Sequence, residues 1–415
     1  MTNDAVKPWL SIVGIGENGL DGITSTAKAL ISSAEIIIGG KRHLSIIPNN
    51  GQTRLVWPSP LSQLVKQLGD FRGRKTCILA TGDPMCYGIG STLTRSISLK
   101  EMTIIPSPSA LALACARTGW KHEEVDLVTL HGRPLALIES YLRPRGKLIV
   151  LSNDKNTPIE LAVHLVERGY EDSHLTVFEH MGGPLEKQFC GYARNWNHPA
   201  GATLNTVAVK LSRGKGSFLK TRLPGLSDEA YTNDGQLTKR EVRTLTICAL
   251  EPYPGALLWD VGAGSGAISI EWMRTDRRCK AIAVEQDSKR AALIAENAEN
   301  LGTPHLKIVN KKAPESLDNL PRPNAIFIGG GITNKGLFEK CWLALREGGC
   351  LVCNVVTIEG EAKVFRQQKR FGGSLTRLAV SRLTSIGRVN SWQPLKQVTQ
   401  WKLCKPDLRN ENTRK

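Results

Sequence analysis

The sequence has no long apolar run, no leader-like N-terminus and few aromatic residues. No apolar stretch in the 415 residues approaches the ~18 residues that a membrane-spanning helix needs. The opening residues also lack the positive-then-apolar layout of a secretory signal. We therefore expect a soluble protein of the cytoplasm.

Aromatic residues make up only 6% of the chain. Neither an Asn-Pro-Pro-Tyr-like motif nor a basic strip interleaved with aromatic residues is found. Enzymes that modify bases use aromatic side chains as stacking platforms. This shortage argues against a nucleic-acid partner, although an RNA methyltransferase stays the main alternative because of the charge described next.

Acidic residues are outnumbered, with 38 Asp and Glu against 55 Lys and Arg, so the formal net charge is +17. A basic surface favours an anionic partner, which can be a nucleic acid, an acidic lipid or a polycarboxylate. A general lysine and arginine bias of the proteome explains the charge equally well.

The ten cysteines are scattered, and most lie in apolar surroundings. This pattern is typical of reduced cysteines in a protein core. Cys350 and Cys353 have C-x-x-C spacing, but they fall in an expected strand, where residues three apart point to opposite faces. With no second such pair, we predict no metal site.

Strand-like and helix-like segments alternate along both halves of the chain, which predicts open α/β layers. A basic, glycine- and proline-containing stretch separates the halves, with the border near Gly216 to Gly225. We therefore predict a first domain over residues 1–215, a linker over 216–229 and a second domain over 230–415.

The second domain contains the stretch "LLWDVGAGSGAISIEWMR", read as a buried strand, a glycine turn and a helix. Glycines allow a tight turn and a close approach of the backbone to a ligand. An acid, Glu285, ends the next expected strand, where its carboxylate is suited to grip a ribose diol.

This loop also satisfies the G-x-G-x-x-A pattern of dinucleotide-binding proteins, so an NAD-dependent oxidoreductase is a further alternative. Two features favour S-adenosylmethionine (SAM). Asp260 stands two residues before the first glycine, where it suits the amino-acid end of SAM, and the loop follows a helix instead of opening its domain. An NAD enzyme would also leave the first domain unexplained.

The segments "GQLTKREVRTLTICAL", "FIGGG" and "GGCLVCNVVTIE", with the glycine loop, resemble the class I SAM-dependent decarboxylating precorrin methyltransferases. The resemblance covers nearly all of residues 230–404. It implies a Rossmann-like fold and SAM contacts from Thr238, Gly262, Ala263, Gly264, Ser265, Gly266, Glu285 and Ala313. Lys312 stands where that family commonly has an acid beside the adenine.

The segments "IVGIGENG", "ATGDPMCYGIGSTL", "LHGRP" and "VFEHMGGPLEKQ" resemble the tetrapyrrole methylase family over about residues 8–212. That family binds SAM between two α/β lobes, largely through backbone groups. The resemblance implies SAM contacts from Gly14, Gly16, Gly82, Asp83, Met85, Ser107, Met181 and Ala208.

The two domains in this order resemble the bifunctional, decarboxylating C5,15-methyltransferases of precorrins, in cobalamin synthesis. This implies two SAM sites, C5 methylation by the first domain, and C15 methylation with loss of the C12 acetate carboxyl group by the second. It also implies a precorrin substrate and a homo-oligomer. A non-catalytic tetrapyrrole carrier is the last alternative.

A polycarboxylate substrate calls for cations, and arginine suits bidentate grip of a carboxylate. Arg382 and Arg388 are candidates for this role, and solvated surface charge is the alternative for both. Glu241 and Glu359 are the candidate acid or base groups. His131, in "LHGRP", either faces substrate or makes a structural hydrogen bond.

Overall fold

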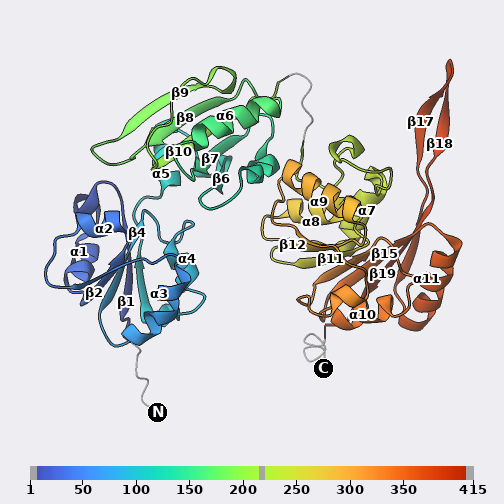
Figure 1. Ribbon diagram of the computed structural model, residues 1–415, viewed down its shortest axis with the longest axis horizontal. Coiled ribbons are helices and arrows are strands. Elements are labelled where there is room, and N and C mark those ends of the chain that lie inside the picture. Colours follow the sequence, from blue (N-terminus) through green and yellow to red (C-terminus); the bar gives the residue numbers. More distant parts are fainter. Residues whose placement is uncertain (1–6, 215–219, 408–415) are drawn as a thin grey trace, which may run out of the picture. The chain divides into compact units, whose positions relative to one another are not determined.

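The computed structural model describes residues 7–214 and 220–407 and divides into two compact units (Figure 1). Unit 1 comprises Met1–Arg133 and Arg143–Ser217, and unit 2 comprises Pro134–Leu142 and Phe218–Lys415. Within the described ranges, no helix has both the length and the apolar character needed to cross a bilayer. The predicted α/β class is confirmed in both units.

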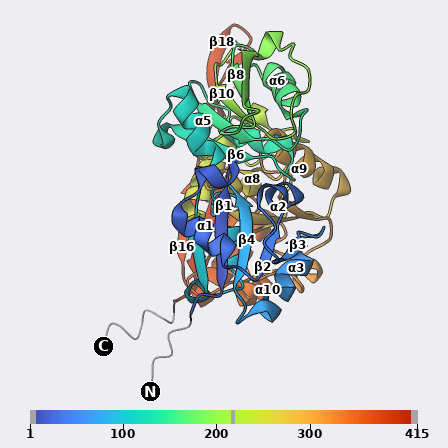
Figure 2. The same cartoon turned by 90° about the vertical axis from the view of Figure 1, so that its left-hand side faces the viewer.

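Unit 1 begins with a five-stranded parallel sheet of order β3-β2-β4-β1-β5. Figure 2 shows β1, β4 and β2 side by side in this sheet. Its strands are β1 (Leu10–Ile15), β2 (Ile36–Gly39), β3 (Thr53–Val56), β4 (Thr76–Thr81) and β5 (Met102–Ile105). Its helices are α1 (Ser25–Ser32), α2 (Lys41–Ile46), α3 (Ser62–Gln67) and α4 (Ile89–Leu93). β1 is buried along almost its whole length, as an apolar run within a parallel sheet predicts.

A second five-stranded sheet in unit 1 is mixed, with order β6-β7-β10-β8-β9. Only β6 and β7 are parallel, and the other pairs are antiparallel. The strands are β6 (Val125–Thr129), β7 (Lys147–Leu151), β8 (His174–Glu179), β9 (Lys187–Tyr192) and β10 (Asn205–Lys210). The helices α5 (Ala110–Thr118) and α6 (Thr157–Glu167) accompany this part of the chain. The two sheets form the two lobes that the tetrapyrrole methylase resemblance implies.

Unit 2 is built on a seven-stranded sheet of order β13-β12-β11-β14-β15-β19-β16. The first five strands are parallel, and β19 and β16 continue the sheet in antiparallel pairs. The strands are β11 (Leu257–Val261), β12 (Lys280–Val284), β13 (Lys307–Val309), β14 (Ala325–Ile328), β15 (Cys350–Val355), β16 (Ser374–Leu378) and β19 (Val398–Cys404). The helices are α7 (Arg240–Leu250), α8 (Ala267–Thr275), α9 (Ser288–Asn300), α10 (Leu337–Ala344) and α11 (Ile358–Phe371).

A two-stranded hairpin, β17 (Ser381–Ile386) and β18 (Val389–Pro394), projects away from this sheet within unit 2 (Figure 1). Hydrophobic clusters cover both faces of the sheet itself, and one cluster contains Cys350 while the other contains Cys353. The two thiols therefore lie on opposite faces, as their spacing in a strand predicts.

The domain border differs from the prediction in two places. The segment Pro134–Leu142, expected in the first domain, belongs to unit 2. There the fully buried Glu139 pairs with Lys220 at 2.5 Å. This ion pair joins residues 81 positions apart, so local sequence pattern does not reveal it.

The predicted linker 216–229 falls partly outside the described residues, at 216–219. Its described part packs into unit 2, because Leu226 is buried and the backbone N–H of Gly225 donates to the Glu271 carboxylate at 2.6 Å. Residues 220–229 are thus part of the second unit and not a free connection.

Candidate functional site

A cavity of about 790 Å³ opens at the carboxyl ends of the parallel strands of unit 2. This edge is where open parallel sheets bind their ligands. The volume lies within the range of small-molecule sites, ~300–1,000 Å³. The lining runs from Lys311 and Ala313, beyond β13, to Val398, at the start of β19.

The glycine loop forms one wall of the cavity. Gly262, Gly264 and Gly266 have φ values of +74°, +59° and +79°, a region that other residues rarely adopt. A Cβ atom at Gly262 would lie 2.9 Å from the backbone N of Gly330, which comes from the neighbouring strand end. The loop therefore needs glycine for its conformation and for its close packing.

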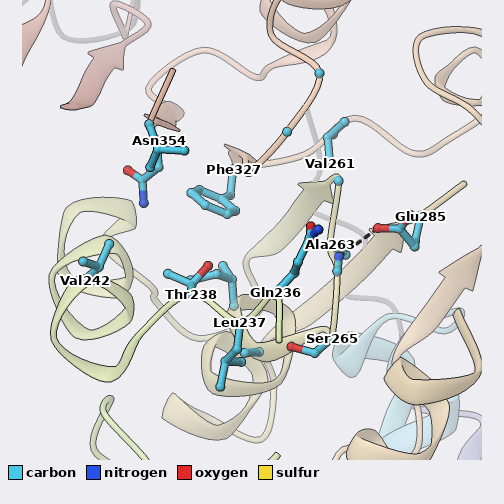
Figure 3. A pocket seen from close by; sticks show the side chains of 18 of the residues that line it. Gln236, Leu237, Thr238, Val242, Val261, Ala263, Ser265, Glu285, Phe327 and Asn354 are labelled. Carbon is cyan, nitrogen blue, oxygen red and sulfur yellow. Dashed lines mark hydrogen bonds between the residues drawn. The ribbon is translucent and has the colours of Figure 1, made fainter. Parts of the chain in front are cut away.

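Glu285 directly follows β12 and holds the glycine loop (Figure 3). One carboxylate oxygen accepts the N–H of Gly264 at 2.9 Å, and the other accepts the N–H of Asp287 at 3.0 Å. Because each carboxylate oxygen can accept more than one hydrogen bond, lone pairs remain for ligand hydroxyl groups. The side chain is only 5% exposed and lines the cavity.

The other residues predicted to contact SAM in this half lie in or beside the lining of the same cavity. Thr238, Ala263, Ser265 and Ala313 all line the cavity, while Gly266 closes the loop just behind it. Lys311, and not Lys312, is the lysine of this pair that lines the cavity.

Asp260 lies in β11, two residues before the first glycine of the loop. It is fully buried, and one carboxylate oxygen accepts hydrogen bonds from the backbone N–H and the hydroxyl of Ser269, at 3.0 and 2.8 Å. This oxygen therefore ties β11 to α8, while the other carboxylate oxygen is buried without a hydrogen-bond partner among the described residues. Burial raises the pKa of Asp260 to about 6.

The opposite end of the cavity contains a polar network that sequence reasoning missed. Asn354, near the end of β15, lies away from Glu285 in Figure 3, on the side of Val242 and Phe327. Its amide donates to the Thr246 hydroxyl at 2.8 Å and accepts from Gln400 at 3.1 Å. An amide at the end of an otherwise apolar strand was the available signal for this residue.

Two of the predicted catalytic residues are paired with each other. The Arg382 guanidinium donates to both oxygens of Glu241, at 2.6 and 3.1 Å, and to Asp228 at 2.9 Å. The hydrogen bond from Arg382 lowers the pKa of Glu241, and the same bond raises the pKa of Arg382 above its usual range. Neither side chain is among the described residues that line the cavity.

Two further candidates in unit 2 are exposed. Arg388 lies in the turn between β17 and β18, at the tip of the hairpin, and Glu359 lies in the first turn of α11. Neither belongs to the cavity lining among the described residues.

In unit 1, three predicted SAM contacts from different strand ends converge. The Ser107 hydroxyl donates to the Gly14 carbonyl at 2.8 Å, and the Ser107 N–H donates to the Gly82 carbonyl at 3.2 Å. A Cβ atom on Gly14 would lie 1.9 Å from the Gly82 carbonyl oxygen. These backbones approach so closely that only glycine fits at position 14.

The remaining candidates of unit 1 lie in varied surroundings. Asp83 caps its own turn by accepting the N–H of Met85 at 2.8 Å, and Met85 is exposed. Gly16 follows β1, where a Cβ atom would lie 2.9 Å from the Asn18 side-chain oxygen. Both Asp83 and Gly16 hold loop conformations at strand ends.

Met181 and Ala208 belong to one buried hydrophobic cluster of unit 1. Ala208 is also paired on both sides within the second sheet, because β10 lies between β7 and β8. His131 is exposed in the turn after β6, and its backbone N–H donates to the Thr129 hydroxyl at 3.3 Å.

Comparison with known proteins follows the same division of the chain. Residues 10–192 match the family model of tetrapyrrole (corrin/porphyrin) methylases, and residues 229–405 match the model of the precorrin methyltransferase domain.

The similarity to two curated relatives extends over almost the whole chain. A precorrin-6Y C(5,15)-methyltransferase [decarboxylating] of Sinorhizobium sp is 41% identical over 96% of this chain and 97% of the relative. The protein of the same name in Mycobacterium tuberculosis is 39% identical over 95% of this chain and 99% of the relative. A crystal structure of the C-terminal domain of a Rhodobacter capsulatus precorrin-6Y C5,15-methyltransferase is 36% identical over 45% of this chain and 100% of that one, with a TM-score of 0.42.

The two family models account for both glycine-containing strand ends, and the relatives are matched from end to end. The chain is therefore a methyltransferase and belongs to the family of the decarboxylating precorrin-6Y C(5,15)-methyltransferases.

Proposed function

We propose that this chain binds SAM at two separate sites and methylates a precorrin at C5 and C15, with loss of CO₂ from the C12 acetate, in cobalamin synthesis. The first domain carries the C5 reaction and the second carries the C15 reaction and the decarboxylation. The single observation that supports this most strongly is the end-to-end match to relatives of this name, with a different methyltransferase family matching each half.

The residues of the second domain fit SAM. Glu285 lies in the cavity wall with carboxylate lone pairs available for ribose hydroxyl groups, and the loop Gly262–Gly266 presents its backbone beside it. Ala313 lies beyond β13, where we place the adenine, and Thr238 lies before α7. SAM supplies an electrophilic methyl group on sulfur.

For the first domain we propose a SAM site at the strand ends that carry Gly14, Gly16, Gly82, Asp83, Met85 and Ser107, with Met181 and Ala208 behind it. The close backbone approach at Gly14 supports this placement, because it brings the strand ends that carry Gly14, Gly82 and Ser107 together.

Methyl transfer depends mainly on the alignment of the macrocycle with the methyl group of SAM, and it needs no activated side chain. A meso carbon of the macrocycle forms a bond to the methyl group while the sulfur–carbon bond breaks, and the protein holds the two partners in line. In the decarboxylation, the bond to the carboxyl carbon breaks and its electron pair passes into the protonated macrocycle, as electron sinks act elsewhere.

For Glu241 and Arg382 we propose a structural role in place of acid–base catalysis and substrate binding. Because their charges already compensate each other, they act as positioning residues that hold β17 against α7. Arg382 pairs in register with Gln393, which lines the cavity, so the pair supports that wall. Glu359, Arg388 and His131 are exposed and stay candidates for substrate contact.

We also propose that the enzyme acts in the cytoplasm as a homo-oligomer and without a nucleic-acid partner. The supporting arguments are those of composition and family resemblance given above. Mass spectrometry of the product tests the main proposal. Purified protein with SAM and precorrin should add two methyl groups and release CO₂. Methyl transfer to bulk tRNA or rRNA, with a steep dependence on salt, would instead support the RNA alternative.

A further inference from the structure

The cavity of unit 2 has more positive than negative side chains in its lining. The charged lining residues are Lys239, Glu285, Arg290, Lys311 and Lys396. Arg290 is paired with Asp234 at 2.8 Å, and the Glu285 carboxylate accepts backbone N–H groups. Within residues 7–214 and 220–407, no carboxylate lies in ion-pair contact with the three lysines.

These lysines lie at different ends of the cavity. Lys311 follows β13, beside Ala313, at the end where we place the adenine. Lys396 lies between β18 and β19, at the other end. Four strand spacings separate β12, which precedes Glu285, from β19, or about 19 Å at ~4.8 Å per strand.

Lys239 belongs to the same end as Lys396. It is the N-cap residue of α7, directly after Thr238 and three residues before Val242. In Figure 3, Thr238 and Val242 lie on the side of Asn354, away from Glu285. Val242, Phe327 and Val356 supply apolar side chains to the lining of the same cavity.

We propose that Lys239 and Lys396 bind carboxylates of the tetrapyrrole and set its orientation in the second domain. This inference rests on the proposed function of that domain. A lysine ammonium is a point charge on a flexible stem, so it can meet acetate and propionate arms of differing length. The arginines predicted from sequence are less suited to bind substrate carboxylates. Arg382 is already paired with Asp228 and Glu241, and Arg388 lies at the tip of the hairpin.

The two lysines hold carboxylates other than the one that departs. A cation on the departing group would stabilise the ground-state charge that decarboxylation removes, and so would slow the reaction. The apolar part of the lining, which includes Val242, Phe327 and Val356, is the better surrounding for that group.

The test uses the full chain with Lys239→Gln, Lys396→Gln and the double variant. C15 methylation should show a precorrin KM raised about two- to fivefold in each single variant and about tenfold or more in the double variant, as exposed charge pairs allow. SAM affinity by calorimetry and C5 methylation should stay as in the wild-type protein. Added salt should raise the wild-type KM and change that of the double variant much less.

Two controls keep the result specific. Lys280→Gln removes the same charge from the start of β12, at the edge of the sheet opposite the cavity, and should leave KM unchanged. Lys311→Gln removes a lining charge at the adenine end, and its effect should fall on SAM affinity and not on precorrin KM.

An unchanged precorrin KM in the double variant, with C15 methylation intact in the wild-type protein, overturns the lysine assignment and leaves the proposed function standing. An equal rise in KM for Lys280→Gln also overturns it, because general charge would then suffice. If the wild-type protein forms no C15-methylated product, the proposed function itself fails.

Discussion

The Arg382 guanidinium and the Glu241 carboxylate, 141 positions apart, form a two-point ion pair with N–O distances of 2.6 and 3.1 Å. The pair joins the base of the β17–β18 hairpin to the first turn of α7. Because each of the two charges already has a partner, the pair serves to position the hairpin base against α7 and does not leave a free charge for a ligand.

A double-mutant cycle on this pair tests that role. Arg382→Ala and Glu241→Ala should each destabilise unit 2, with a coupling free energy of about 0.5–1 kcal/mol, since both side chains are more than one-third exposed. Urea unfolding gives the coupling. Precorrin KM should rise about two- to fivefold, while kcat stays near the wild-type value. A large loss of kcat without loss of stability would show a direct catalytic role.

The pH dependence of this pair follows from the lowered pKa of Glu241. A depressed carboxyl pKa gives stability that is present above the ordinary glutamate value and is lost as pH falls through the lowered one. The coupling should therefore be constant between pH 6 and 8, about two units or more above the ordinary pKa of ~4.3. A coupling that decreases within this window would contradict the observed geometry.

Glu285 offers the sharpest test of the second SAM site. Glu285→Ala removes an acceptor for ribose hydroxyl groups and the anchor of Gly264, so SAM binding should weaken about ten- to a hundredfold, as the ~1.5–3 kcal/mol of a charged hydrogen bond implies. Calorimetry should still find the first site at full affinity. Asp318→Ala, at an exposed carboxylate of the same unit, is the matched control. Unchanged SAM binding in Glu285→Ala would place the ribose elsewhere.

Gly14→Ala should act only on the first site. The added methyl group would lie 1.9 Å from the Gly82 carbonyl oxygen, so β1 and the Gly82 turn must separate. C5 methylation should fall at least tenfold, while C15 methylation continues. Gly51→Ala is a control, because no atom lies within 4 Å of a Cβ there, although its positive φ makes it mildly strained. Retained C5 activity in Gly14→Ala would rule out this strand end as the methyl-transfer site.

The buried carboxyl group of Asp260 should make the stability of unit 2 depend on pH. Burial raises its pKa from 3.8 to about 6. A raised carboxyl pKa gives stability that is complete below the unfolded value and is lost as pH rises through the folded value. The loss between about pH 4 and pH 6 should be about 3 kcal/mol, at 1.36 kcal/mol for each unit.

Asp260→Asn should remove this part of the pH dependence, because the amide does not ionise. Urea titrations at pH 4, 5, 6 and 7 measure the slope in wild-type and variant protein. Asp318→Asn, at the exposed carboxylate, should keep the wild-type slope. Equal slopes in Asp260→Asn and the wild-type protein would mean that Asp260 is ionised throughout.

The sequence by itself determined the features that depend on neighbouring residues. Alternating apolar strands and helices specify the α/β layers, because each strand buries both faces of a parallel sheet. The glycines at 262, 264 and 266 specify the loop, since a positive φ is a property of single residues. Glu285 could be found because it directly follows the next strand, and parallel strands end at one edge.

Only the tertiary structure decided the features that join distant residues. It paired Arg382 with Glu241, buried Asp260 beneath α8, brought Pro134–Leu142 into unit 2 and placed Lys239 and Lys396 around one cavity. The period of a strand or helix shows which face a residue occupies, but not which distant charge meets it there. Whether an arginine binds substrate or an internal carboxylate therefore depends on packing across more than a hundred residues, because only the folded chain brings the competing partners within hydrogen-bond distance.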